Sequence, residues 1–144
     1  MVFTMIVEQT KKYRKRICYE AQTNTFYESE YDSLAFARSF LQPYGWIKES
    51  GTPPGPHWDV ILMTENDYTL GDEVPVKVVG LFKRADGDHK YIAVEAGRGI
   101  DDYGGLSETE RDDLKRLYPR AGAGEGWFGR GEAERAMRDC AKAL

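Results

Sequence analysis

The segment from Glu73 to Arg84 constrains the fold most, because valines at 74, 76 and 78 alternate with other residues there. An alternation of period two is typical of a strand with one buried face. The turn Ala85-Asp86-Gly87-Asp88 follows, and the stretch from His89 to Glu95 is again largely apolar. An Asp-Gly turn between two such runs predicts a β-hairpin.

Strand signals dominate the chain from residue 2 to residue 95, with no internal repeat and no linker between domains. The same criteria predict strands at Val2–Glu8 and Trp58–Met63, and a hairpin at Arg16–Tyr27 with its turn near residues 23–24. The segment from Ser33 to Leu41 fits either a helix or a strand. We therefore expect a single domain, residues 1–144, that begins with antiparallel β-structure.

The last third of the chain changes to a helical period. Ser107-Glu108-Thr109-Glu110 is a capping box, which predicts a helix over residues 107–118 that ends before Pro119. A second helix is expected over residues 132–143. Its apolar face would consist of Ala133, Ala136, Met137, Cys140, Ala141 and Leu144. The predicted fold class is α+β, a small antiparallel OB-like barrel with two C-terminal helices packed outside.

Composition narrows the classes of function. The formal net charge of −4 argues against nucleic acid as the ligand, although Lys11–Arg16 holds five cations in six residues. The N-terminus lacks the basic region of a signal peptide, and no apolar run is long enough to span a bilayer. Cys18 and Cys140 show no metal-ligand spacing. We expect reduced thiols in a cytoplasmic protein without a membrane partner.

Read in order, these segments resemble the soluble (family I) inorganic pyrophosphatases over nearly the whole chain. The segment Pro43-Tyr44-Gly45-Trp46-Ile47 and the strand ending in Glu8 match, and Asp59-Val60-Ile61-Leu62 is similar to the end of the motif D-x-D-P-x-D-[VL]-L. The run from Gly71 to Asp86 and the closing turn Gly126-Trp127-Phe128-Gly129 follow at similar intervals. The resemblance implies the pyrophosphatase fold and the homo-oligomers common in that family.

The resemblance also implies a site that hydrolyses diphosphate, or a related phosphoanhydride, with Mg²⁺ or Mn²⁺. Carboxylates would hold the metal, and those of Asp59, Asp86 and Asp88 would also be catalytic. The implied metal ligands are Asp59, Asp86, Asp88 and Glu8, and the implied substrate-binding residues are Lys90, Tyr44, Arg16 and Arg38. Three aspartates this close would repel one another, which predicts a raised pKa for one of them in the metal-free protein.

Several positions depart from the pattern of the family. Pro54 and Pro56 stand where the first two aspartates of the motif would be, and the second of these aspartates helps to activate the attacking water. A late Tyr-Lys pair falls around Ala121-Gly122 and is missing. Arg16 stands in for a phosphate-binding lysine, and Arg38 for an arginine across a short insertion. Activity on diphosphate is therefore expected to be reduced or altered.

Each candidate residue also has a simpler interpretation. Asp59 fits a turn residue that bonds its own backbone, and Asp86 and Asp88 fit a solvated hairpin tip. Lys90 and Glu8 fit exposed strand positions, and His57 and His89 show no zinc spacing. Two hypotheses of different classes remain open at this point. The protein is either a weakened phosphoanhydride hydrolase or a catalytically lapsed protein of the same fold that acts as an anion-binding or assembly module.

Overall fold

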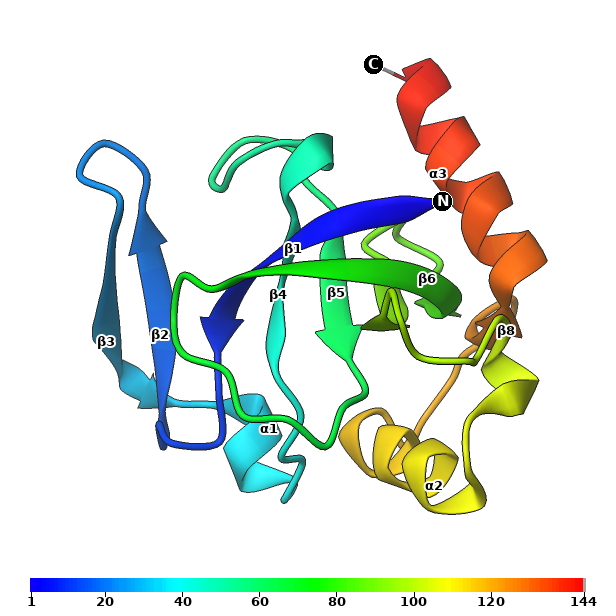
Figure 1. The fold of residues 1–144 in the computed structure, drawn as a ribbon, viewed down its shortest axis with the longest axis horizontal. Helices are drawn as coiled ribbons and strands as arrows, with labels where there is room; N and C mark the ends of the chain where they lie inside the picture. The colour runs from blue at the N-terminus through cyan, green and yellow to red at the C-terminus, as the bar shows by residue number, and fades with distance from the viewer. Residues whose placement is uncertain (144) are drawn as a thin grey trace.

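The structure, a computed structural model, describes residues 1–143, and the side chains of residues 140–144 lie outside the description. Five strands form a closed barrel in the order β1-β4-β5-β7-β6 (Figure 1). A further strand, β8, pairs with the last four residues of β6, Gly80 to Lys83. The strands are β1 (Val2–Gln9), β4 (Tyr44–Ile47), β5 (Asp59–Leu62), β6 (Glu73–Lys83), β7 (Lys90–Glu95) and β8 (Gly126–Gly129).

The expected barrel with helices outside is confirmed, with one difference in strand direction. β5 and β7 run parallel, with Asp59 opposite Lys90, whereas the sequence predicted antiparallel pairing throughout. The closed ring explains the difference. Strands cannot alternate in direction all the way round a ring of five, so at least one neighbouring pair must be parallel. That pair lies at the centre of the candidate site described below.

The β2–β3 hairpin stands to one side of the barrel as a separate two-stranded sheet (Figure 1). It consists of β2 (Lys15–Glu20) and β3 (Thr25–Asp32), so the hairpin predicted over residues 16–27 is confirmed. A single-turn helix α1 (Leu34–Ala37) follows and resolves the ambiguity of residues 33–41. Two 3₁₀ turns, η1 (Lys48–Ser50) and η2 (Tyr103–Gly105), complete the connections.

Both C-terminal helices form where the sequence predicts them, as α2 (Glu108–Leu117) and α3 (Arg130–Ala143). Ser107 caps α2, and its hydroxyl and the Glu110 side chain form the expected capping box. Ala133 and Met137 of α3 are buried, while the expected contribution of Cys140, Ala141 and Leu144 lies outside the described side chains. Within residues 1–143, no helix is long and apolar enough to cross a membrane.

Two apolar cores lie on opposite faces of the barrel wall. Alternate residues such as Val60 and Leu62 of β5 fill the interior, together with side chains from the other four barrel strands. The intervening Ile61 and the residues that share its face, such as Ile92 of β7, pack outside against α2. Asp59 and Lys90 belong to the alternation of Ile61 and Ile92. They therefore point to the outer face, next to the core under α2.

Candidate functional site

Adjacent barrel strands place four polar side chains in one row on this outer face. Strand order makes them near neighbours, since β1, β4, β5 and β7 pair consecutively. Asp59 lies opposite Lys90, and Tyr44 lies two residues along β4 from Trp46, the partner of Asp59. We call these residues the polar row: Glu8 of β1, Tyr44 of β4, Asp59 of β5 and Lys90 of β7. Four of the positions that the resemblance implied are thus brought together by the fold.

The centre of the polar row is a shielded ion pair. Lys90 Nζ lies 2.8 Å from Asp59 Oδ2, and the two side chains are 9% and 14% exposed. Burial alone would raise the pKa of Asp59, but hydrogen bonds from His57 and Lys90 hold it below its usual value. Burial alone would lower the pKa of Lys90, but the bond to Asp59 raises it. Both groups are therefore charged at neutral pH.

His57 holds the other oxygen of Asp59. Its Nε2 lies 3.0 Å from Asp59 Oδ1, and its Nδ1 lies 2.8 Å from the Gly55 carbonyl oxygen. The bond to Asp59 raises the pKa of His57 above its usual value. This histidine shows no zinc spacing in the sequence and was not predicted as part of the site. The sequence signal that could have identified His57 is its position two residues before Asp59, because residues i and i+2 of an extended segment face the same side.

Glu8 is the acidic group whose ionisation is suppressed. Burial, followed by the charge of Asp59, raises its pKa to about 7, although His57, Arg16 and Lys90 act in the opposite direction. The sequence analysis expected a raised pKa among Asp59, Asp86 and Asp88. The pKa values of Asp59 and Asp86 are instead lowered, and the rise falls on Glu8. The cationic partners of Asp59 keep its pKa low. Glu8 is partly buried and lies close enough to Asp59 to sense the negative charge of that carboxylate, which keeps the pKa of Glu8 high.

Two tyrosines border the polar row. Burial raises the pKa of Tyr44, and the negative charge of Asp59 adds to the effect. Burial likewise raises the pKa of Tyr118, which is close enough to sense the charges of Lys90 and Asp59. Tyr118 stacks on Phe82, with ring centroids 4.8 Å apart. The late tyrosine of the family pattern falls near residue 121 and is missing from the sequence. The turn after α2 nevertheless places Tyr118 beside the polar row.

The tip of the β6–β7 hairpin contributes Asp88 more directly than Asp86. Asp88 Oδ1 lies 3.2 Å from Lys90 Nζ, so Asp59 and Asp88 share one ammonium group. The exposed Asp86 accepts a hydrogen bond from the Asp88 backbone N–H and pairs with Arg84 at 3.6 Å. Each of the three aspartates thus pairs with a cation of the protein, Asp59 and Asp88 with Lys90 and Asp86 with Arg84. Their carboxylates do not surround one shared space.

The two arginines of the predicted site differ in position. Arg16 is exposed, but its charge acts on Glu8, which places it at the edge of the polar row. Arg38 donates a hydrogen bond to the Leu117 carbonyl oxygen at the end of α2. The Arg38 guanidinium therefore ties α1 to α2. Its predicted role in substrate binding stays a prediction.

The residues present fit one hard cation better than a cluster of ions. Among the described side chains, residues 1–139, no group of three or more histidine, cysteine, aspartate or glutamate residues is arranged to hold a metal. Pro54 and Pro56 are exposed and carry no side-chain oxygen. Mg²⁺ commonly binds through only one or two carboxylates together with water and substrate phosphates. Glu8 and Asp59, whose charges repel each other, are the pair that such an ion would stabilise.

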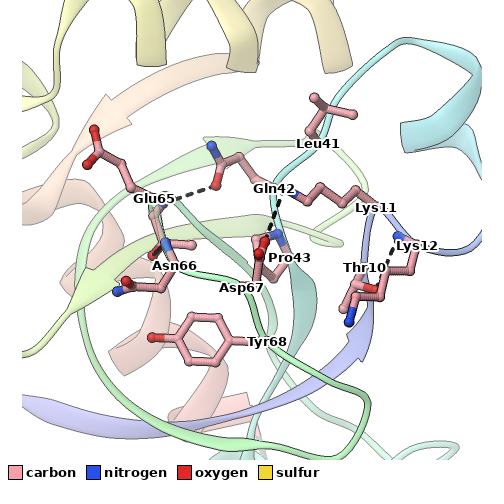
Figure 2. A pocket seen from close by; sticks show the side chains of 11 residues that line it. Thr10, Lys11, Lys12, Leu41, Gln42, Pro43, Glu65, Asn66, Asp67 and Tyr68 are labelled. Atoms are coloured by element: carbon pink, nitrogen blue, oxygen red, sulfur yellow. Dashed lines mark hydrogen bonds and ion pairs between the residues drawn. The ribbon is translucent and has the colours of Figure 1, made fainter.

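A separate cavity of about 200 Å³ lies where β1 and the segment before β4 meet the loop after β5 (Figure 2). Figure 2 shows Lys11 reaching Asp67, to which its Nζ is 3.0 Å distant. Gln42 accepts a hydrogen bond from the Thr64 backbone N–H in the same cavity. Lys11 of the basic segment is thus neutralised locally. This segment contributes to the polar row only through Arg16.

Comparison with solved structures identifies the fold. An inorganic pyrophosphatase from Neisseria gonorrhoeae superposes with a TM-score of 0.75 at 19% identity, covering 96% of this chain and 88% of that one. The enzyme from Coxiella burnetii gives 0.73 at 18% identity, covering 96% and 92%. The enzyme from Thermus thermophilus gives 0.68 at 21% identity, covering 96% and 88%. No protein-family model and no curated protein matches the sequence. The chain has the fold of the inorganic pyrophosphatases.

Proposed function

We propose that this protein binds diphosphate or a related phosphoanhydride at the polar row and hydrolyses it slowly to phosphate. The observation that carries the proposal is the meeting of Glu8, Tyr44, Asp59 and Lys90 on four neighbouring strands of a pyrophosphatase fold. The identity of 15–21% to structures of that fold supports the architecture only. The chemistry of the site supports the choice of substrate class.

The cations of the site suit an oxyanion substrate. Lys90, Arg16 and His57 bring positive charge to one edge of the barrel, and charge-assisted hydrogen bonds to phosphate oxygens are among the strongest polar contacts. His57 has a raised pKa, so it carries a proton over more of the neutral range than a free histidine. Both ring nitrogens are engaged by Asp59 and Gly55, so we assign His57 the role of a positive charge beside the phosphates and not that of a proton donor.

A divalent ion, where bound, would be held by Glu8 and Asp59 and would supply charge neutralisation of the substrate phosphates. Glu8 has a pKa of about 7 in the metal-free protein, and a divalent ion beside it would favour its ionised form. Pro54 and Pro56 remove two acidic groups from the adjacent loop. A missing general base commonly lowers the rate on the order of 10²–10⁴-fold, which is why we propose slow hydrolysis.

One observation favours a second candidate function, that of an anion-binding module without catalysis. Both oxygens of Asp59 already accept hydrogen bonds from His57 and Lys90. A carboxylate with two cationic partners has less to gain from a metal ion. In this alternative the phosphoanhydride binds to Lys90 and Arg16 and is released unchanged.

Phosphate release from diphosphate in millimolar Mg²⁺ or Mn²⁺ tests the proposal. We expect slow turnover that depends on the ion, and loss of most of it in Asp59→Asn. Asp101→Asn is a matched control, because that exposed carboxylate pairs with Lys77 on the surface. Binding of diphosphate without detectable release would favour the anion-binding module. Absence of both binding and release would refute the proposed function.

A further inference from the structure

A second cavity, of about 480 Å³, opens between the β2–β3 hairpin and the barrel. Tyr19 of β2, Phe26 of β3 and Trp46 of β4 line it and form what we call the aromatic trio. The ring of Tyr19 lies 5.0 Å from that of Phe26 and 4.9 Å from that of Trp46, measured between centroids. The hairpin thus brings two rings against the ring of Trp46 on the barrel, and all three line a single space.

The aromatic trio adjoins the polar row. Trp46 is the cross-strand partner of Asp59, and Asp59 is the partner of Lys90, so the three side chains lie in sequence across β4, β5 and β7. On β1, Ile6 lines the cavity, and Glu8 follows two residues later on the same face. Two strand spacings, about 10 Å, separate the positions of Trp46 and Lys90. The polar-row residues do not line the cavity, so a ligand that uses both must span about this distance from the aromatic trio.

Polar groups complete the rim of the cavity. Asn24 accepts a hydrogen bond from the Tyr19 hydroxyl through Oδ1, and its amide N–H groups remain as donors. Lys48 and Glu73 form an ion pair of 2.6 Å at the opposite rim, and Thr52 comes from the proline-rich loop. Aromatic faces with donors and acceptors at their edges suit a flat, polar heterocycle better than an aliphatic chain.

We propose that the aromatic trio binds the base of a nucleoside diphosphate whose phosphates lie on the polar row. The inference rests on the proposed function and narrows its substrate class from bare diphosphate to a phosphoanhydride that carries a base. Base–aromatic stacking is tolerant of the base because every base has a π-face. In hydrolysis, water would attack the terminal phosphorus and the bond to the bridging oxygen would break, which releases phosphate and a nucleoside monophosphate.

Calorimetric titration of the whole chain with ADP, diphosphate and adenosine tests the inference. We expect ADP to bind at least about tenfold more tightly than diphosphate, a factor typical of stacking one base. Phe26→Ala should reduce ADP affinity to that of diphosphate and leave diphosphate binding unchanged. Tyr27→Ala is the matched control, because Tyr27 is the next residue on β3 and is 54% exposed. It should bind ADP like the wild type.

The outcomes separate this inference from the proposed function. Equal affinities for ADP and diphosphate would overturn the inference while the proposed function stands. Adenosine binding as tightly as ADP would also overturn it, because the phosphates would then make no contact with the polar row. If neither ADP nor diphosphate binds, both proposals fail. Should Phe26→Ala not fold, Phe26→Leu retains an apolar side chain without the ring, and the same loss of ADP affinity is expected.

Discussion

The ammonium group of Lys90 lies between the carboxylates of Asp59 and Asp88, in a residue that is only 7% exposed. Desolvation of a charge is costly, and the two acidic partners offset that cost. Asp59 in turn depends on Lys90 and His57 for its own charge compensation. Removal of one member of this group therefore leaves the others with an uncompensated buried charge.

Lys90→Met should destabilise the protein by about 3 kcal/mol, the usual cost of breaking a buried ion pair from one side. Urea unfolding at pH 7 measures the change. Lys11→Met is the control, since its ion pair with Asp67 joins side chains that are 50% and 71% exposed. Such surface pairs contribute less than about 1 kcal/mol. Equal effects of the two substitutions would contradict the account of Lys90.

Glu8 should make stability depend on pH. Its folded pKa of about 7 lies above its ordinary value of 4.5, so the folded state binds more protons between these limits. Its contribution to stability is therefore fully present below pH 4.5 and is lost as the pH rises to about 7. The loss is at most about 3 kcal/mol. Glu8→Gln should remove this component, and unfolding from pH 4.5 to 8 measures it. An unchanged pH profile would contradict the prediction.

The pairing of β1 with β4 holds Glu8 and Tyr44 together, and Gly45 permits it. A Cβ atom at residue 45 would overlap the Ile6 carbonyl oxygen, which belongs to the backbone of β1. Backbone atoms in a paired strand cannot move away as a flexible side chain can. The two strands therefore approach closely only because residue 45 has no side chain.

Gly45→Ala should separate β1 from β4, destabilise the barrel by more than about 2 kcal/mol and weaken diphosphate binding. Thermal unfolding and calorimetry measure the two effects. Gly97→Ala serves as the control, because a Cβ atom there would have open space around it. If Gly45→Ala were as stable as the wild type, the close approach of these strands would not be required.

The elements differ in how well the sequence predicted them. The hairpin of β6 and β7 and the capping box of α2 are long or chemically specific signals, and both were confirmed. β4 and β8 were not predicted as strands, because each has only four residues and these include glycine, which weakens a strand signal. β5 is equally short but is continuously apolar after Asp59. The parallel pair of β5 and β7 follows from closure of the ring, which no local pattern encodes.

At the scale of the whole molecule, the barrel is the feature that this chain shares with the inorganic pyrophosphatases. The fold superposes on pyrophosphatases at 15–21% identity, since apolar residues of suitable size preserve a core without identical sequence. The sequence predicted Glu8, Asp59 and Lys90, which lie on regular strands at fixed intervals. It missed His57 and Tyr118, whose positions depend on a loop and on the end of a helix. The assignment of Arg38 to the site stays a prediction, and its guanidinium donates a hydrogen bond to the Leu117 carbonyl oxygen of α2.

The central claim is that the fold and the polar row are intact while the missing aspartates limit catalysis. The most direct test compares phosphate release from diphosphate, in Mg²⁺, by the wild type and by Pro54→Asp with Pro56→Asp. Both prolines are exposed, so the core should tolerate the change. We expect the double variant to be at least about tenfold faster, since a general base contributes 10²–10⁴-fold. Wild-type turnover that the two aspartates leave unchanged would contradict the claim.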